Sequence, residues 1–236
     1  MKEKLVFALD VSNFEEAESL VKELKDYVGV FKVGKELFTA VGPDIFKMII
    51  KNGGNVFADM KYNDIPNTVA SASRVLVNYD VQIFNIHANG GYEMIKQTRE
   101  AIDDEAKKLG KKRPVLLAVT VLTSLSDEDM KMMNINETAK EHVLTLAKMA
   151  KDAGADGVVC SPQEVTLIKE NLGSDFITLT PGIRPAWSVK GDQKRIMTPR
   201  EAVEKGTNYI VVGRPIKAAE NRVEAAKKIL DEMEGK

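Results

Sequence analysis

The segment Val56–Asn78 reads VFADMKYNDIPNTVASASRVLVN, a short apolar run followed by a longer amphipathic stretch. The run Val56–Met60 has the length and apolar content of a buried strand. The stretch Pro66–Asn78 predicts a helix, because its apolar residues recur at helical spacing and proline is favoured in the first helical turn. A strand that leads into a helix without a hairpin is the repeating unit of parallel α/β folds.

The same unit recurs on both sides of this segment, along the whole chain. Short apolar runs predict strands at Leu5–Leu9, Val30–Val33, Val56–Met60, Gln82–Ile86, Val115–Val119, Gly157–Cys160, Phe176–Leu179 and Tyr209–Val212. Amphipathic segments predict helices at Phe14–Tyr27, Lys35–Asn52, Pro66–Asn78, Gly91–Leu109, Glu137–Asp152, Pro162–Asn171, Pro199–Lys205 and Ile216–Glu234. Eight strand–helix units without hairpins require a parallel sheet that closes on itself. We therefore predict an α/β fold, a (β/α)8 TIM barrel, with residues 1–236 as a single domain.

An open, doubly wound sheet is the competing architecture. Such sheets usually have about six strands and a glycine-rich turn after the first strand. The first turn here is Asp10-Val11-Ser12-Asn13 and contains no glycine. The number of units and this turn both favour the barrel.

The amino-acid composition argues against several kinds of partner and site. Lys+Arg 34 against Asp+Glu 35 gives a net charge of -1, so the chain has no overall basic field for nucleic acid or a membrane surface. The single Cys160 excludes an internal disulfide, and with two histidines a thiolate or histidine-rich metal site is not expected. The apolar runs are too short for a signal peptide or a membrane span. We expect a cytoplasmic protein, in which a local cluster of basic residues would point to a small anionic ligand.

Charged residues follow several of the predicted strands, where TIM barrels place their active sites. Asp10 ends the first strand, Lys32 lies in the second, and Asp59, Lys61 and Asp64 follow one another at the third. Asp59 and Lys61 are two residues apart and so point to the same side of a strand. Two carboxylates nearby would keep Lys61 protonated, ready to donate a proton. The alternative is structural: Asp64 caps the next helix while Asp59 and Lys61 form an ion pair.

The loops after the last two strands are the usual phosphate site of these barrels. Gly213-Arg214-Pro215 follows the last strand and starts a predicted helix, where backbone amides and a bidentate guanidinium favour an anion. The preceding loop, from Pro181 to Thr198, is long and cationic and contains Arg184 and Gln193. It has the character of a lid that closes over a ligand. An ordinary exposed loop, charged for solubility, explains its composition equally well.

Two residues at other strand ends receive structural interpretations. We expect His87 to make a hydrogen bond at the barrel rim, and Cys160 to be a small buried apolar residue without a neighbouring base. Gly29, Gly154 and Gly206 follow predicted helices, where a left-handed cap is expected.

The stretch Asp59-Met60-Lys61-Tyr62-Asn63-Asp64-Ile65-Pro66-Asn67-Thr68 resembles the D-x-K-x-x-D-I-x-x-T signature of the orotidine 5'-monophosphate decarboxylases. The resemblance continues, in order and spacing, through Leu9-Asp10, Phe31-Lys32-Val33-Gly34, Val119–Ser124, Thr180–Arg184 and Val212–Ile216. Because it covers the whole chain in several separate motifs, it is much more specific than any one motif. The length is similar to that of the bacterial branch.

The resemblance implies decarboxylation of orotidine 5'-monophosphate to uridine 5'-monophosphate in de novo pyrimidine biosynthesis, without a cofactor or metal ion. By position, Lys61 would protonate C6 after CO2 leaves, Asp59 would lie next to the substrate carboxylate, and Asp64 would complete the charged set with Lys32. It also implies a homodimer, in which Asp64, Ile65 and Thr68 reach into the partner's site.

The remaining contacts implied by the resemblance are to the ribose, the pyrimidine and the phosphate. Asp10 and Lys32 would contact the ribose hydroxyls, and Thr123 and Ser124 would lie near the pyrimidine. The phosphate region would be served by Arg184, Gln193, Gly213 and Arg214.

Two other functions stay open at this point. A Mg²⁺-dependent sugar-phosphate decarboxylase or aldolase of the same superfamily resembles the D-x-K-x-x-D stretch, but it carries an acid on the second strand. Lys32 stands there in this chain, and lysine does not bind Mg²⁺ as a carboxylate does. A non-catalytic barrel that binds a nucleotide phosphate is the second alternative. The complete charged set argues against it, because a binding protein needs no buried proton donor.

Overall fold

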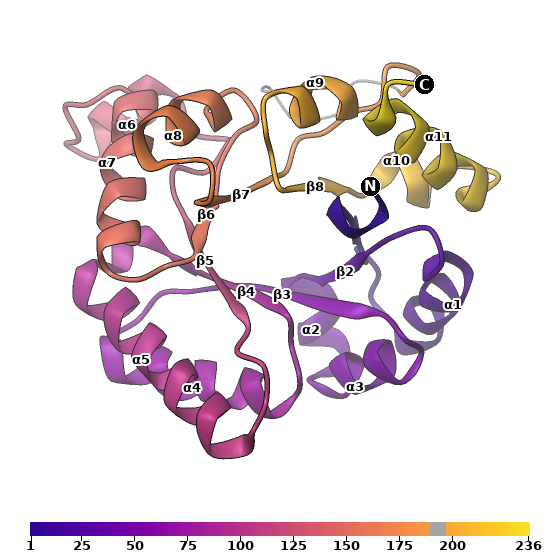
Figure 1. Cartoon of the computed structure of the whole chain (residues 1–236), viewed down its shortest axis with the longest axis horizontal. Helices are drawn as coiled ribbons and strands as arrows, with labels where there is room; N and C mark the ends of the chain where they lie inside the picture. Colours follow the sequence, from indigo (N-terminus) through magenta and orange to yellow (C-terminus); the bar gives the residue numbers. More distant parts are fainter. Residues whose placement is uncertain (189–196) are drawn as a thin grey trace.

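The computed structural model describes residues 1–188 and 197–236. Eight parallel strands pair in chain order, and β1 pairs with β8, so the sheet closes into a barrel. The helices form a ring outside the strands (Figure 1). The strands are β1 (Leu5–Ala8), β2 (Val30–Val33), β3 (Asn55–Tyr62), β4 (Ile83–His87), β5 (Val115–Val119), β6 (Gly157–Val159), β7 (Ile177–Thr180) and β8 (Tyr209–Val212). The predicted (β/α)8 barrel is confirmed.

The helices of the described residues follow the strands in the expected alternation. They are α1 (Phe14–Leu24), α2 (Lys35–Val41), α3 (Asp44–Lys51), α4 (Pro66–Asn78), α5 (Tyr92–Leu109), α6 (Asp127–Met132), α7 (Ala139–Asp152), α8 (Val165–Leu172), α9 (Pro199–Glu204), α10 (Arg214–Lys217) and α11 (Arg222–Glu234), with short 3-10 turns at Lys2–Lys4 and Ala88–Gly90. Among these helices, none is both long enough and apolar enough to cross a membrane.

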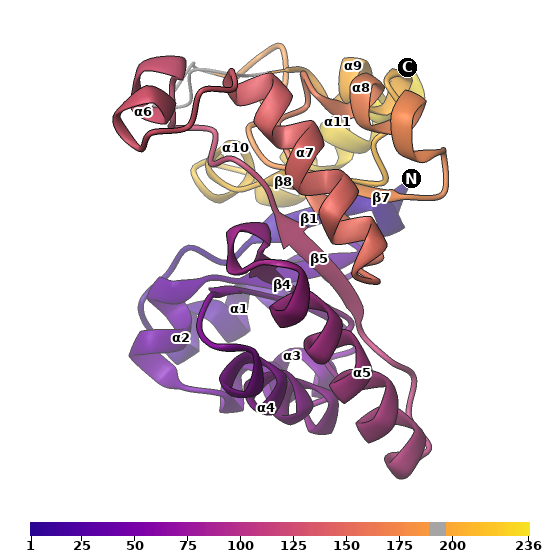
Figure 2. The same ribbon diagram turned by 90° about the vertical axis from the view of Figure 1, so that its left-hand side faces the viewer.

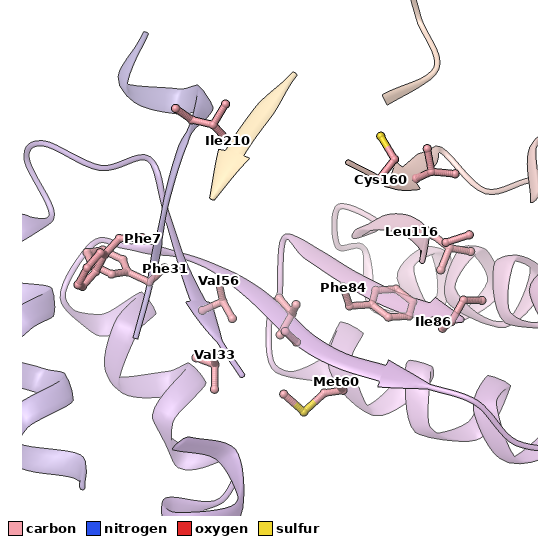
Figure 3. Close-up of a cluster of buried hydrophobic side chains, with 14 of the residues drawn as sticks. Phe7, Phe31, Val33, Val56, Met60, Phe84, Ile86, Leu116, Cys160 and Ile210 are labelled. Carbon is pink, nitrogen blue, oxygen red and sulfur yellow. The ribbon is translucent and has the colours of Figure 1, made fainter. Parts of the chain in front are cut away.

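The strands are buried on both faces, because helices cover the outside and side chains fill the inside. In β1, Val6 and Ala8 belong to the inner cluster, whereas Leu5 and Phe7 pack outward against the helices. Figure 3 shows part of the outward cluster, in which Phe7 and Phe31 meet edge to face with their ring centroids 6.4 Å apart. These two apolar layers hold the strand ends in fixed positions.

Two predicted helices are each divided in the structure. The predicted helix Lys35–Asn52 is two helices, α2 and α3, because Gly42 has a positive φ of 69° and Pro43 follows it. The predicted helix Ile216–Glu234 is α10 and α11, and Asn221 caps α11 by accepting a hydrogen bond from the Glu224 amide at 2.9 Å. A third predicted helix, Pro162–Asn171, begins only at Val165.

Helix α6 was not predicted. Ser126 and Asp129 form a capping box at its start, in which each side chain accepts from the other residue's backbone amide. The helix lies at the periphery of the molecule, outside the ring of strands, in both views (Figure 2). Met132 of this helix is 78% exposed, whereas Met130 is buried.

The prediction of left-handed caps is correct at Gly154 and Gly206, whose φ angles are 94° and 90°. It is wrong at Gly29, which has no positive φ. A Cβ atom at Gly29 would stand 2.6 Å from the backbone of Glu3, so glycine is needed there for close packing against the N-terminal turn.

Candidate active site

A cavity of about 210 Å³ opens at the carboxyl ends of the strands, above the inner layer of the core. Its floor consists of apolar residues that also fill the barrel. Its charged wall comes from β2 and β3. The lining residues are Lys32, Phe57, Asp59, Lys61, Val119, Val121, Leu122, Thr123, Val159, Cys160, Leu179, Pro181 and Val211. A mostly apolar cavity with a few convergent charges is the usual form of a small-molecule site.

Strand register places the charged side chains on the inside of the barrel. Ala8, Lys32 and Phe57 are neighbours across β1, β2 and β3. Ala8 and Phe57 belong to the inner cluster, so Lys32 also faces inward. Asp59 is two residues beyond Phe57 and lies on the same side, one layer closer to the cavity mouth.

Four of the predicted residues form one continuous ion-pair cluster. Lys32 Nζ lies 3.2 Å from Asp10 Oδ1 and 3.5 Å from Asp59 Oδ2, and Lys61 Nζ lies 2.5 Å from Asp59 Oδ1. Gly34 leaves room for this arrangement, because a Cβ atom there would approach Lys32 Nζ to 2.9 Å. The cluster brings together residues that are far apart in sequence, as the barrel prediction requires.

Burial and charge oppose each other at Asp59, whose side chain is 13% exposed. Desolvation raises the pKa of this carboxyl, but Lys32 and Lys61, together with hydrogen bonds from Lys61 and Asn85, outweigh it and hold the pKa below the ordinary value. Asp59 is therefore an anion at neutral pH, and it forms an ion pair with Lys61.

The regular alternation of side chains along a strand does not explain how Lys61 comes to face the cavity. The pairing of β3 with β4 shifts register between Ala58 and Tyr62, which is a β-bulge. Lys61 lies in this bulge with φ at 53°, a left-handed conformation that residues with a Cβ rarely adopt. Asp59 and Lys61 do meet, as predicted, but the bulge aims Lys61 at Asp59.

Asp64, Ile65 and Thr68 are exposed on this chain. Asp64 Oδ1 accepts a hydrogen bond from the Ile65 amide at 2.6 Å, and in the described part of the chain no ion pair joins Asp64 to Lys61. Ile65 is the N-cap residue of α4 and makes no side-chain cap, so the capping alternative for Asp64 is wrong. Ile65 is 67% exposed.

Of the two residues predicted near the pyrimidine, Thr123 lines the cavity. Ser124 is exposed and is not among the lining residues. Both follow β5, in the connection that leads to α6.

The predicted phosphate residues lie where β7 and β8 end. Gly213 is the N-cap residue of α10 and Arg214 is its first residue, exposed at the surface. A Cβ atom at Gly213 would stand 3.4 Å from Asp10 Oδ2, so this turn lies directly beside the charged cluster. Arg184 is buried, and its Nη1 donates to the Ile183 carbonyl at 3.0 Å. Gln193 lies outside the described residues, as do the other residues of the expected lid between 189 and 196.

Two polar residues of the site had no predicted role. Asn85, on β4, donates to Asp59 Oδ1 at 2.7 Å and accepts from the Lys61 backbone amide at 2.8 Å. Lys217, on α10, donates to the backbone carbonyl of Asp10. The sequence could have indicated Asn85, because it is a polar residue inside an otherwise apolar strand. Nothing in the sequence indicates Lys217.

The two residues given structural interpretations are both near the cavity. Cys160 is fully buried in its lining, and burial raises the pKa of its thiol well above the ordinary value, as expected for an unreactive cysteine. Burial lowers the pKa of His87, and the nearby cations Lys61 and Lys35 lower it further. The imidazole is therefore neutral at physiological pH.

No group of three or more His, Cys, Asp or Glu side chains that could hold a metal ion occurs among residues 1–188 and 197–236. A second cavity, of about 320 Å³, opens at the opposite end of the barrel, and its wall includes Glu3, Asn55 and Arg113. It lies at the amino ends of the strands, away from the charged cluster.

Comparison with known proteins gives a consistent result. Residues 3–229 match the family model described as "Orotidine 5'-phosphate decarboxylase / HUMPS family". The chain is 53% identical over 230 residues to an orotidine 5'-phosphate decarboxylase of Geotalea daltonii, with 98% of this chain and 95% of the relative covered. It is 51% identical over 232 residues to the enzyme of that name from Geobacter sulfurreducens, with 98% and 96% covered.

A solved structure of similar fold carries the same name. The crystal structure of orotidine 5'-phosphate decarboxylase from Lactobacillus acidophilus superposes with a TM-score of 0.86 and is 41% identical in sequence. The match covers 97% of this chain and 98% of that one.

Proposed function

This chain belongs to the orotidine 5'-phosphate decarboxylase / HUMPS family, and from that membership we propose how its residues catalyse the reaction. The reaction is the decarboxylation of orotidine 5'-monophosphate to uridine 5'-monophosphate in pyrimidine biosynthesis. We propose that it proceeds without a cofactor, with Lys61 as the proton donor. The contact of Lys61 Nζ with Asp59 Oδ1, at 2.5 Å on the wall of the cavity, is the observation that supports this most.

The chemical step breaks the bond between C6 and the carboxylate and leaves its electron pair on C6. The pyrimidine ring has no carbonyl placed to delocalise that pair, so stabilisation has to come from the protein. An ammonium fixed in advance beside C6 stabilises the developing negative charge. Lys61 then transfers a proton, so that a C–H bond forms at C6, an N–H bond of Lys61 breaks, and CO2 leaves.

Asp59 has two effects in this proposal. Its carboxylate holds the Lys61 side chain in place through an ion pair at 2.5 Å in a largely buried site. It also lies next to the substrate carboxylate, whose negative charge passes to C6 as neutral CO2 leaves. Lys32 balances Asp59 from the other side and links it to Asp10.

The other contacts hold the nucleotide. Asp10 and Lys32 would bind the ribose hydroxyls, and Thr123 and Ser124 would lie near the pyrimidine. Arg184, Gly213 and Arg214 would bind the phosphate together with Gln193, which is outside the described residues. Phosphate binding far from C6 can contribute to the rate when the interaction strengthens towards the transition state.

We propose further that the enzyme is a homodimer in which Asp64, Ile65 and Thr68 complete the partner's site. The exposure of all three residues, which follow the strand that carries Lys61, supports this, and the 67% exposure of Ile65 supports it most. Complementation tests it: Lys61→Ala and Asp64→Asn protomers, mixed and allowed to exchange, form hybrid dimers with one intact site. An equal mixture should recover roughly one quarter of wild-type activity, because about half the dimers are hybrids. No recovery, with exchange demonstrated, contradicts a shared site.

We also propose that the enzyme works in the cytoplasm. The sequence has one cysteine, so it forms no internal disulfide, which is the pattern of reducing compartments.

The direct test of the reaction is the loss of orotidylate absorbance on addition of purified protein, with EDTA present throughout. Fast conversion to uridylate in EDTA supports a metal-independent decarboxylase. Activity only with Mg²⁺ and a keto-sugar phosphate would support the sugar-phosphate decarboxylase or aldolase alternative. Tight uridylate binding without turnover would support the non-catalytic alternative.

A further inference from the structure

Asn85 is a buried polar residue on the inner face of β4, and it is 1% exposed. Its side chain forms hydrogen bonds with two residues of β3, and both belong to the charged cluster. Nδ2 donates to Asp59 Oδ1 at 2.7 Å, and Oδ1 accepts from the Lys61 backbone amide at 2.8 Å. Buried polar groups are nearly always hydrogen-bonded, and here the two partners belong to the two members of one ion pair.

The orientation of this amide is determined by its partners. A backbone N–H can only donate, so it requires the Asn85 oxygen, and an ionised carboxylate can only accept, so it requires the nitrogen. A rotation of the amide by half a turn would lose both bonds at once. Asn85 is thus held in one orientation, and it holds Asp59 and Lys61 in turn.

The β-bulge explains why a side chain is needed there. Where β3 shifts register against β4, between Ala58 and Tyr62, the ordinary backbone ladder is interrupted. The Lys61 amide meets the Asn85 side chain in place of a backbone carbonyl. This bond stabilises the left-handed conformation of Lys61, which has a φ of 53° and which a residue with a Cβ does not prefer.

We propose that Asn85 is a positioning residue for decarboxylation: it fixes the backbone of Lys61 and the carboxylate of Asp59 so that the Lys61 ammonium is aimed into the cavity. This inference rests on the proposed role of Lys61 as the proton donor. Asn85 is not among the residues that line the cavity, so it acts through Asp59 and Lys61 and not on the substrate.

The first test is Asn85→Ala, measured as kcat and KM for orotidylate. We expect kcat to fall by roughly 10²-fold, the effect of a displacement of about 1 Å at a reacting group, while KM changes by only a few fold. The reason is that the ribose and phosphate contacts are made by other residues.

Asn208→Ala is the matched control. Asn208 also bridges a backbone amide and a lysine, accepting from Thr178 N at 2.9 Å and from Lys169 Nζ at 2.8 Å, but it lies away from the charged cluster. Both variants lose partly buried hydrogen bonds and should have a lower Tm. Only Asn85→Ala should lose kcat. Equal kcat values in the two variants would overturn the proposal.

A second variant, Asn85→Asp, remains informative if the alanine variant fails to fold. It keeps an acceptor for the Lys61 amide but replaces the donor to Asp59 with a second carboxyl. Two carboxyls at this distance cannot both ionise easily, so one proton is shared between them. The singly protonated pair restores both the charge and the hydrogen bond of the wild type.

The pH profile is therefore the decisive readout for Asn85→Asp. Besides Asp59, the charged or titratable groups around the new carboxyl are Lys61 from β3, Lys32 from β2 and His87 from β4. We expect kcat of this variant to rise, relative to wild type, as the pH falls and the pair takes up its proton. A profile parallel to that of the wild type would contradict the proposal.

Wild-type turnover separates the two levels of the argument. If the wild type does not convert orotidylate, the proposed function fails. If it does, and Asn85→Ala has a normal kcat, only the positioning role fails.

Discussion

Truncation of Lys61 to alanine tests the proposed mechanism most directly. Lys61 Nζ contacts Asp59 Oδ1 at 2.5 Å, and the lysine side chain is 26% exposed at the cavity wall. After truncation, Asp59 keeps Lys32 at 3.5 Å and Asn85 at 2.7 Å. The remaining carboxylate is still paired and hydrogen-bonded, so we expect the variant to fold.

The expected loss of rate follows from the two effects of the ammonium. General acid catalysis contributes roughly 10²–10⁴-fold. A preorganised group at a developing charge contributes roughly 10²–10³-fold. If both are lost, kcat falls by roughly 10⁴–10⁷-fold, which corresponds to about 5–10 kcal/mol of transition-state stabilisation. Uridylate affinity should stay within roughly tenfold of wild type, because the lost interaction acts mainly in the transition state.

The assay is single-turnover decay of orotidylate absorbance at high enzyme concentration, with uridylate affinity measured by calorimetry. Lys61→Arg is the informative second variant, because it keeps a cation but gives up a proton much less readily. We expect it to bind nucleotide and to remain strongly impaired. Lys47→Ala is the control: it removes a lysine that is paired with Asp44 at 2.9 Å on the outer helix α3.

A fall in kcat of less than tenfold in a folded Lys61→Ala variant would refute the assignment of Lys61 as proton donor. A comparable loss in Lys47→Ala would show that the effect comes from general destabilisation.

Three further predictions follow from the same structure. The pKa of Asp59 is below its ordinary value in the folded state, so the contribution of this carboxylate to stability is complete above the unfolded pKa of about 3.9 and is lost as the pH falls through the folded value. Asp59→Asn should therefore lower the free energy of unfolding by about 3 kcal/mol at neutral pH. It should also make urea unfolding less sensitive to acid, and an unchanged acid sensitivity would contradict this. Arg214→Ala should raise KM for orotidylate by more than tenfold, since a bidentate charged contact to phosphate contributes about 1.5–3 kcal/mol; steady-state kinetics with an unchanged KM would exclude Arg214 from the phosphate site. Gly157→Ala would bring a Cβ atom to 2.1 Å from the Ile177 carbonyl oxygen. The free energy of unfolding should therefore fall by at least roughly 1–3 kcal/mol. A wild-type Tm would contradict this, because it would mean that β6 and β7 can move apart at little cost.

The sequence predicted those residues of the candidate site that lie at the carboxyl ends of strands. Asp10, Lys32, Asp59 and Lys61 were expected together because each lies near the carboxyl end of an apolar run or directly after it, and a parallel barrel brings all these ends to one face. Asn85 lies within a strand, and its role was not predicted. Its partners are an amide and a carboxylate of β3, and no pattern within β4 indicates that β3 is bulged opposite it.

The sequence by itself determined the alternation of strands and helices, and hence the eight-stranded barrel, because apolar periodicity is a local property that each segment carries independently. It also placed the charged residues at one end of that barrel. Only the tertiary structure decided the left-handed conformation of Lys61, the break at Gly42 between α2 and α3, and the bridge made by Asn85. These features depend on the register between neighbouring strands and on close packing between segments distant in sequence, and both arise only when the barrel closes.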